Sequence, residues 1–213
     1  TSLLAEPLGP SLGIQAQLPI LLAEYPFRTQ QDIADYLHLL QDLPRYFSDL
    51  IALEQEKSRQ GVFQNDLAVD GIIRQCSAFL ADADTPESHL LHTVFQNKLQ
   101  ASSLFSEAER NLCLQTHEKL LTSCVFPAYR SLSDALSSLR GKGTQNAGGL
   151  SRQEDGLSYY AYLLRSRVGV DASPEELTRL LTQQLADQCA EMQIILDQNP
   201  SLSLSCLLYT SPS

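Results

Sequence analysis

The sequence predicts an all-α fold, and three observations lead to this prediction. Apolar residues recur at helical spacing through almost the whole 213-residue chain. No stretch shows the sustained alternation of apolar and polar residues that is typical of a half-buried strand. Helix start signals, in which a capping residue is followed by an acidic residue, occur repeatedly. We therefore expect an elongated multi-helix protein that contains helical hairpins.

Two helices are expected early in the chain. A Thr-x-x-Asp start predicts a helix over residues 29–41, and the Leu-Pro pair that follows predicts a second over 43–60, capped by Gly61. These two should form a hairpin. A third helix is expected over residues 66–81 and a fourth over 89–100.

A long helix should begin at Ser106, where Ser-x-x-Glu forms a capping box, and Pro127 should kink it. Its buried stripe is predicted to comprise Leu121, Cys124, Val125, Ala128, Leu132, Ala135, Leu136 and Leu139. The glycine-rich segment that follows should separate two helical parts, with a short hairpin or extended piece near residues 141–157.

The last helix should start at Ser173, which precedes a proline and two acidic residues. Its buried face is predicted to comprise Leu177, Leu181, Leu185, Met192 and Leu196. The predicted organisation is an N-terminal helical bundle over residues 1–140, a glycine-rich loop over 141–157, a C-terminal helical part over 158–200 and a tail over 201–213. The tail resembles translated sequencing-adapter sequence and the chain opens without Met, so we expect a non-native tail on an internal piece of a longer protein.

Composition excludes several classes of function. A formal net charge of −10 argues against a nucleic-acid partner, because phosphate binding needs clustered Lys and Arg. The longest apolar runs are far shorter than the roughly 20 residues that cross a bilayer, so no transmembrane segment is expected. The five cysteines are odd in number and contain no Cys-x-x-Cys pair, which favours mostly buried free thiols over a disulfide framework or a zinc ribbon: Cys76, Cys113, Cys124, Cys189 and Cys206.

Several segments in collinear order resemble one known family. The first runs from Gly13 through Arg28 to Leu43-Pro-Arg-Tyr-Phe47. The others are residues 47–63, Phe126-Pro-Ala-Tyr129, residues 141–150, Tyr159–Leu164 and Gly169–Glu176. Together they resemble the domain of unknown function 885 family, a group of large, mostly helical bacterial proteins that are zinc-metallopeptidase-like.

The resemblance implies peptide-bond hydrolysis by a larger parent protein. In that parent, a His-Glu-x-x-His helix toward the C-terminal side and an acidic ligand would hold Zn, and the substrate would be a peptide. No such motif occurs in this chain, so we expect it to be an inactive wall of the cleft that lacks its C-terminal catalytic half, with no catalytic residue, metal ligand or cofactor of its own. Family members are often exported or lipid-anchored. The alternative is a stand-alone helical module that binds a partner helix.

The histidines are the residues of this chain that come closest to forming a metal-binding motif. His117-Glu118 starts a metallopeptidase-like sequence, but Leu121 stands where the second histidine is needed. Cys113, His117 and Cys124 share a helical face and could be drawn as a cluster, although a buried stripe with one core histidine explains the same spacing. The pair His89 and His92 is predicted to be exposed to solvent.

Tyr159 and Tyr160 are the candidate residues of a substrate cleft. Their hydroxyl groups and rings could contact a peptide, but adjacent residues on a helix point in different directions, so at most one of them faces the cleft. The carboxylates fall mainly beside Lys or Arg, and we interpret Glu54, Glu56 and Lys57 as one solvent-exposed helix face.

Overall fold

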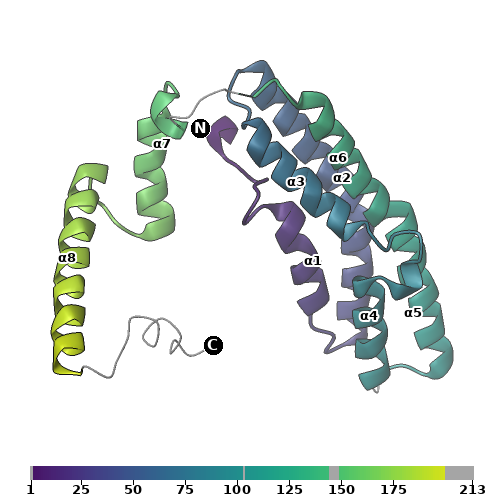
Figure 1. The fold of residues 1–213 in the computed structure, drawn as a ribbon. Coiled ribbons are helices and arrows are strands. Elements are labelled where there is room, and N and C mark those ends of the chain that lie inside the picture. Colours follow the sequence, from purple (N-terminus) through teal and green to yellow (C-terminus); the bar gives the residue numbers. More distant parts are fainter. Residues whose placement is uncertain (1, 103, 144–148, 200–213) are drawn as a thin grey trace. The chain divides into compact units, whose positions relative to one another are not determined.

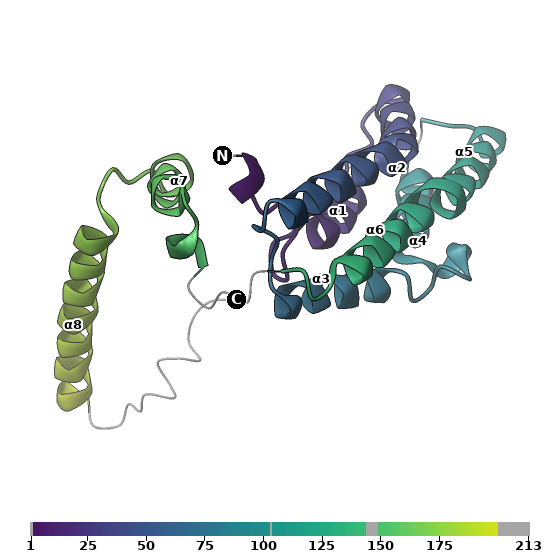
Figure 2. The same ribbon diagram turned by 90° about the horizontal axis from the view of Figure 1, so that it is seen from above.

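The computed structural model describes residues 2–102, 104–143 and 149–199 (Figures 1 and 2). Within these ranges the regular structure is entirely helical and contains no strand, which confirms the all-α prediction. The chain divides into two units, residues 1–153 and residues 154–213.

The first unit is a bundle of long helices joined by short turns. Its helices are α1 (Ile14–Glu24), α2 (Gln30–Arg59), α3 (Asp66–Phe79), α4 (Leu90–Ala101), α5 (Glu107–Leu120) and α6 (Phe126–Leu139). Helix α2 runs alongside α6 and also packs on α5, while α3 packs on α6 and α1 packs on α3 and α4 (Figure 1). Helix α2, the longest helix of the unit, therefore runs along both α5 and α6.

Helix α2 is a single continuous helix, so the predicted hairpin over residues 29–60 is wrong. Thr29 caps its start in a capping box with Asp32, as expected. Pro44 lies inside the helix and is exposed to solvent, so its ring faces away from the core. The helix continues because buried residues on either side of the proline, from Leu40 to Phe47, pack into the same core.

The long helix predicted from Ser106 is present, with an irregular centre. Ser106 and Glu109 form the capping box that begins α5. Between α5 and α6, the residues Leu121–Val125 form one turn of π-helix, η3, directly before Pro127. This turn accommodates the proline, which lacks the N–H group needed for a regular helical bond. Of the predicted stripe, Leu121, Val125, Ala128, Leu132, Leu136 and Leu139 are buried, while Cys124 and Ala135 are half-buried.

The segment before α1 is tied to the bundle by side-chain amides. The amide of Gln15 donates to the Gly9 carbonyl and to Gln75 Oε1, each at 2.6 Å, and Tyr129 Oη donates to the Gln15 carbonyl at 3.0 Å. A Cβ on Gly13 would lie 2.3 Å from the Gly9 nitrogen, so only glycine fits this turn. These bonds hold the N-terminal residues against α3 and α6.

The second unit contains α7 (Gly156–Leu163), the π-helical turn η5 (Leu164–Val168) and α8 (Pro174–Gln198). Ser173 caps α8 in the predicted way, with Glu176 completing the capping box. No residue of α8 is buried, so the predicted buried face of the last helix is wrong. Leu181 and Leu185 are 62% and 64% exposed, and the other three predicted residues are half-buried: Leu177, Met192 and Leu196. In the described part of residues 141–157 the regular structure is the 3₁₀ turn η4 (Gly149–Arg152) and the start of α7, without the extended piece we expected. The predicted non-native tail lies outside the described residues.

Candidate functional site

The candidate site begins where α2 ends. Gly61 adopts a left-handed φ of +71°, its N–H donates to the Ser58 carbonyl at 3.3 Å, and the Val62 N–H donates to the Lys57 carbonyl at 2.9 Å. This pair of bonds is the Schellman motif, which commonly terminates a helix at a glycine. The prediction that Gly61 caps this helix is therefore confirmed. The reversal directs the next residues, Phe63 and Gln64, back into the bundle, where both are buried.

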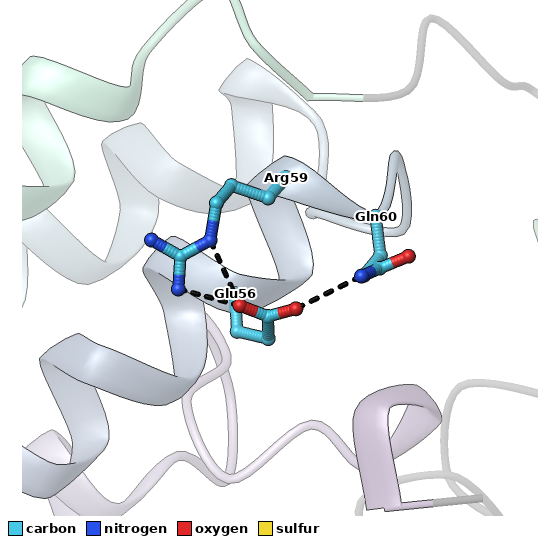
Figure 3. A network of polar contacts seen from close by, with 3 residues as sticks. All are labelled: Glu56, Arg59 and Gln60. Atoms are coloured by element: carbon cyan, nitrogen blue, oxygen red, sulfur yellow. Dashed lines mark hydrogen bonds and ion pairs between the residues drawn. The ribbon is translucent and has the colours of Figure 1, made fainter.

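The last turn of α2 has one solvated side. Glu56 accepts bonds from Arg59 Nε at 2.8 Å and from the Gln60 amide at 2.9 Å, and Figure 3 shows its carboxylate between the two partners. These bonds lower the pKa of Glu56, with the Gln60 bond as the largest cause and the Arg59 bond next. Glu56 is half-buried, with its side chain 37% exposed, so the predicted solvent-exposed face is only partly correct for this residue.

The inner side of the same turn holds a buried ion pair, so the predicted exposed face is wrong for Glu54 and Lys57. Their exposed fractions are 0% and 1%. Lys57 Nζ lies 3.4 Å from Glu54 Oε1 and donates to the Ala5 carbonyl at 3.1 Å. Glu54 Oε2 is buried, and no described residue forms a hydrogen bond with it.

The spacing of residues along α2 indicates this burial. The buried positions of α2 are spaced by three and four residues in turn, and Glu54 and Lys57 continue that series: Ile33, Tyr36, Leu40, Leu43, Phe47, Leu50, Glu54 and Lys57. A charged pair at the positions that extend an apolar stripe is expected to enter the core with it.

A cavity of about 180 Å³ opens beside this ion pair. Lys57, Gln64 and Asn65 line it together with Glu6 from the N-terminal segment, and η4 contributes Gly149 and Leu150. Gln64 is 9% exposed, and its Nε2 is buried without a hydrogen-bond partner among the described residues. Buried amide groups in folded proteins nearly always form hydrogen bonds. The unpaired donor therefore makes this cavity a candidate binding site.

The wall of the cavity depends on a close approach of two backbones. A Cβ on Gly143 would lie only 2.0 Å from the Gln64 carbonyl oxygen, so this position tolerates only glycine. The Gly141 N–H donates to Asp66 Oδ1 at 2.8 Å, and Arg140 pairs with Asp70 at 2.9 Å. These contacts fasten the end of α6 to the start of α3. The central residues of the glycine-rich loop, 144–148, lie outside the described residues.

Glu54, Lys57 and Glu6 influence one another electrostatically beside the cavity. Burial raises the pKa of Glu54, the neighbouring Lys57 lowers it, and Glu6 raises it through like-charge repulsion. Glu6 therefore lies near enough to influence the pair electrostatically, although its own side chain is exposed. Lys57 has three N–H donors and two described acceptors, so one donor is available to a ligand.

A second buried polar side chain in the first unit is that of His117. Its ring stacks on Phe95 with centroids 4.2 Å apart, and its Nε2 lies 3.1 Å from Tyr36 Oη. Burial lowers the pKa of His117 to about 3, with His92 and His89 as further causes. The prediction of exposed His89 and His92 is wrong, because both are buried where α4 packs on the bundle.

The possible metal cluster of Cys113, His117 and Cys124 is not formed in the structure. Among the described residues, no group of three or more His, Cys, Asp or Glu side chains could hold a metal ion. His117 lies in an aromatic stack at 0% exposure, as the core interpretation expected. Of the described thiols only Cys76 is buried, where we had expected most of them to be.

The predicted cleft tyrosines lie on α7. Tyr159 is buried and stacks on Tyr162 with centroids 6.0 Å apart, whereas Tyr160 is 40% exposed. The two neighbours therefore differ in burial, as the helical geometry required. No described helix is long and apolar enough to cross a membrane.

These features define an all-helical protein with a small cavity, lined by polar side chains, at the end of α2. A family model described as "Bacterial protein of unknown function (DUF885)" matches residues 4–205, so the chain belongs to this family. No curated protein matches the sequence.

The fold is similar to that of the putative lipoprotein from Colwellia psychrerythraea, a solved structure. The TM-score is 0.79 at 18% sequence identity, and the similarity covers 92% of this chain and 34% of that one. The chain thus spans about a third of the length of this structural relative. At this identity the likeness shows the fold alone.

Proposed function

We propose that this chain is the helical, non-catalytic part of a larger zinc-dependent peptidase that hydrolyses peptide bonds. The family match over residues 4–205 carries the proposal, together with the zinc-metallopeptidase-like character that the sequence resemblance implies. The chain corresponds to a third of its structural relative, which leaves room for a catalytic half elsewhere.

The environment of His117 supports a metal site outside this chain. A zinc-binding histidine must present a nitrogen to the ion, and a His-Glu-x-x-His helix needs a second histidine one turn later. Here the ring lies within an aromatic stack, and Leu121 is buried at the second position. In this proposal the zinc, the water-activating glutamate and the acidic ligand all come from the catalytic half.

The test compares the 213-residue chain with the longer reading frame that contains it. The longer protein should hold one zinc per chain and cleave a mixture of quenched fluorogenic peptides, and chelation should abolish the cleavage. The 213-residue chain should retain no stoichiometric zinc after dialysis. A longer protein that binds zinc but cleaves no peptide would contradict the proposal.

The apolar side chains of α8 favour a second candidate, a stand-alone module that binds a partner helix. Five of its large apolar residues are at least 46% exposed: Leu180, Leu181, Leu185, Ile194 and Ile195. Sizing with light scattering and thermal melting separates the two candidates. A strictly monomeric chain with a cooperative melting transition would favour the module over the peptidase part, because a stand-alone module folds without a missing half.

A further inference from the structure

The cavity beside Lys57 has the features of a small-ligand site that the family description does not assign. It is enclosed by elements from four parts of the sequence: the N-terminal segment, the end of α2, the start of α3 and η4. Two of its lining residues, Lys57 and Gln64, are polar and more than nine-tenths buried. Buried polar groups that meet at a cavity usually serve a ligand or fixed waters.

The available donors define one end of the ligand. Within the part of the chain that the structure describes, Gln64 Nε2 has no hydrogen-bond partner, and Lys57 Nζ keeps one N–H beyond its bonds to Ala5 and Glu54. The N-terminal end of α3, which carries positive partial charge, reaches the same cavity at Asn65 and Ala68. The Ala68 N–H itself donates to Asn65 Oδ1 at 3.0 Å, so this helix end contributes only its partial charge. The Gln64 amide, the Lys57 ammonium group and this partial charge together favour an oxyanion.

The acidic rim defines the other end. Glu6 lines the same cavity, and the charge of Lys57 is largely balanced by Glu54. A dianion such as phosphate would face the Glu6 carboxylate without a full compensating charge. A ligand with a cationic group next to its carboxylate would instead pair that cation with Glu6.

We propose that this cavity binds a small zwitterion, a free amino acid, with its carboxylate on Lys57 and Gln64 and its ammonium group on Glu6. The size agrees, because a cavity near 150 Å³ holds about six heavy atoms and this one measures about 180 Å³. L-alanine has that number of heavy atoms. The inference does not rest on the peptidase proposal, since every described residue that lines the cavity lies within the first unit, residues 1–153.

Calorimetric titration of the 213-residue chain with L-alanine, acetate and inorganic phosphate tests the inference. L-alanine should bind saturably and about tenfold more tightly than acetate, because it alone engages both ends. Phosphate should not compete. No saturable L-alanine binding, or tighter binding of phosphate than of L-alanine, would overturn the inference.

Variants assign the two ends separately. Gln64→Leu should weaken L-alanine binding about tenfold. The control Gln60→Leu should leave binding unchanged, because Gln60 lies on the solvated side of α2 and bonds only Glu56 among its described side-chain partners. Glu6→Gln alters an exposed side chain and should reduce L-alanine binding to the level of acetate. If neither Gln64→Leu nor Glu6→Gln changes L-alanine affinity, the ligand binds elsewhere and the inference fails.

Discussion

Glu54 and Lys57 are oppositely charged neighbours that the first unit removes almost completely from solvent. Removing an ion pair from water carries a large desolvation cost, which the mutual attraction only partly offsets. Glu54 Oε2 adds to this cost, because in the described ranges of the chain it has no hydrogen-bond partner. Such a pair is retained at the edge of a cavity more readily as part of a binding site than as a source of stability.

Lys57→Met should lower the free energy of unfolding by about 3–5 kcal/mol, because it leaves a buried carboxylate without its partner. The double variant Glu54→Leu, Lys57→Met should recover most of that loss, since both charges are then absent. Urea denaturation followed by circular dichroism measures both. A double variant as unstable as the single one would show that the pair stabilises the fold by its attraction.

His117 makes the stability of the first unit depend on pH. Its pKa is about 3 in the folded chain against 6.5 when free, so the unfolded chain binds the proton first as the pH falls. The folded state is fully favoured above pH 6.5 and loses stability between there and about pH 3. The loss approaches about 1.4 kcal/mol per pH unit.

Denaturation curves from pH 7 to pH 4 should therefore show a steeper decline for the natural sequence than for the double variant Tyr36→Phe, His117→Phe. The double change removes both partners of the Tyr36–His117 bond, so no buried hydroxyl is left unpaired. Carboxylates that titrate in the same range affect both proteins equally. Parallel declines would mean that His117 is accessible to protons in the folded state.

Helix α2 continues through Pro44, as α1 continues through Pro19, although the local sequence favours a break at an internal proline. An internal proline lacks an N–H donor and its ring presses on the carbonyl group four residues earlier, here that of Leu40. The helix persists because its buried stripe passes both sides of Pro44 without interruption.

Pro44→Ala should raise the free energy of unfolding by roughly 1–3 kcal/mol, because it restores the helical bond and removes no buried contact from an exposed position. The matched change Pro174→Ala, at the first position of α8, should not stabilise, since proline is favourable there. Thermal melting of the two variants side by side gives the comparison. A loss of stability in Pro44→Ala would show that the proline ring itself is needed where α2 meets α6.

For the molecule as a whole, the exposed stripe of α8 predicts self-association. Leu181 and Leu185 share one helical face and are largely exposed, and an apolar strip of this kind favours contact with another surface. The double change Leu181→Glu, Leu185→Glu should reduce dye binding and shift the chain toward a monomer in sizing experiments. Gln183→Glu, on the opposite face, serves as the control. Equal behaviour of the two variants would exclude α8 as the associating surface.

The sequence by itself determined the helical class and most helix starts. Thr29, Ser106 and Ser173 each begin a helix as predicted, and Gly61 ends one, because capping depends on bonds within a few residues. The collinear segments also identified the family, which is a property of the sequence alone.

Only the tertiary structure decided which polar residues enter the interior. Helical spacing shows that His89 and His92 or Glu54 and Lys57 share a face, but whether that face meets water depends on elements distant in the sequence. Burial of His89 and His92 accompanies the packing of α4 in the bundle, and burial of Lys57 depends on the N-terminal segment that carries Ala5. The cavity is likewise a product of tertiary packing, since its walls come from residues as distant as Glu6 and Leu150 and no local pattern encodes their meeting.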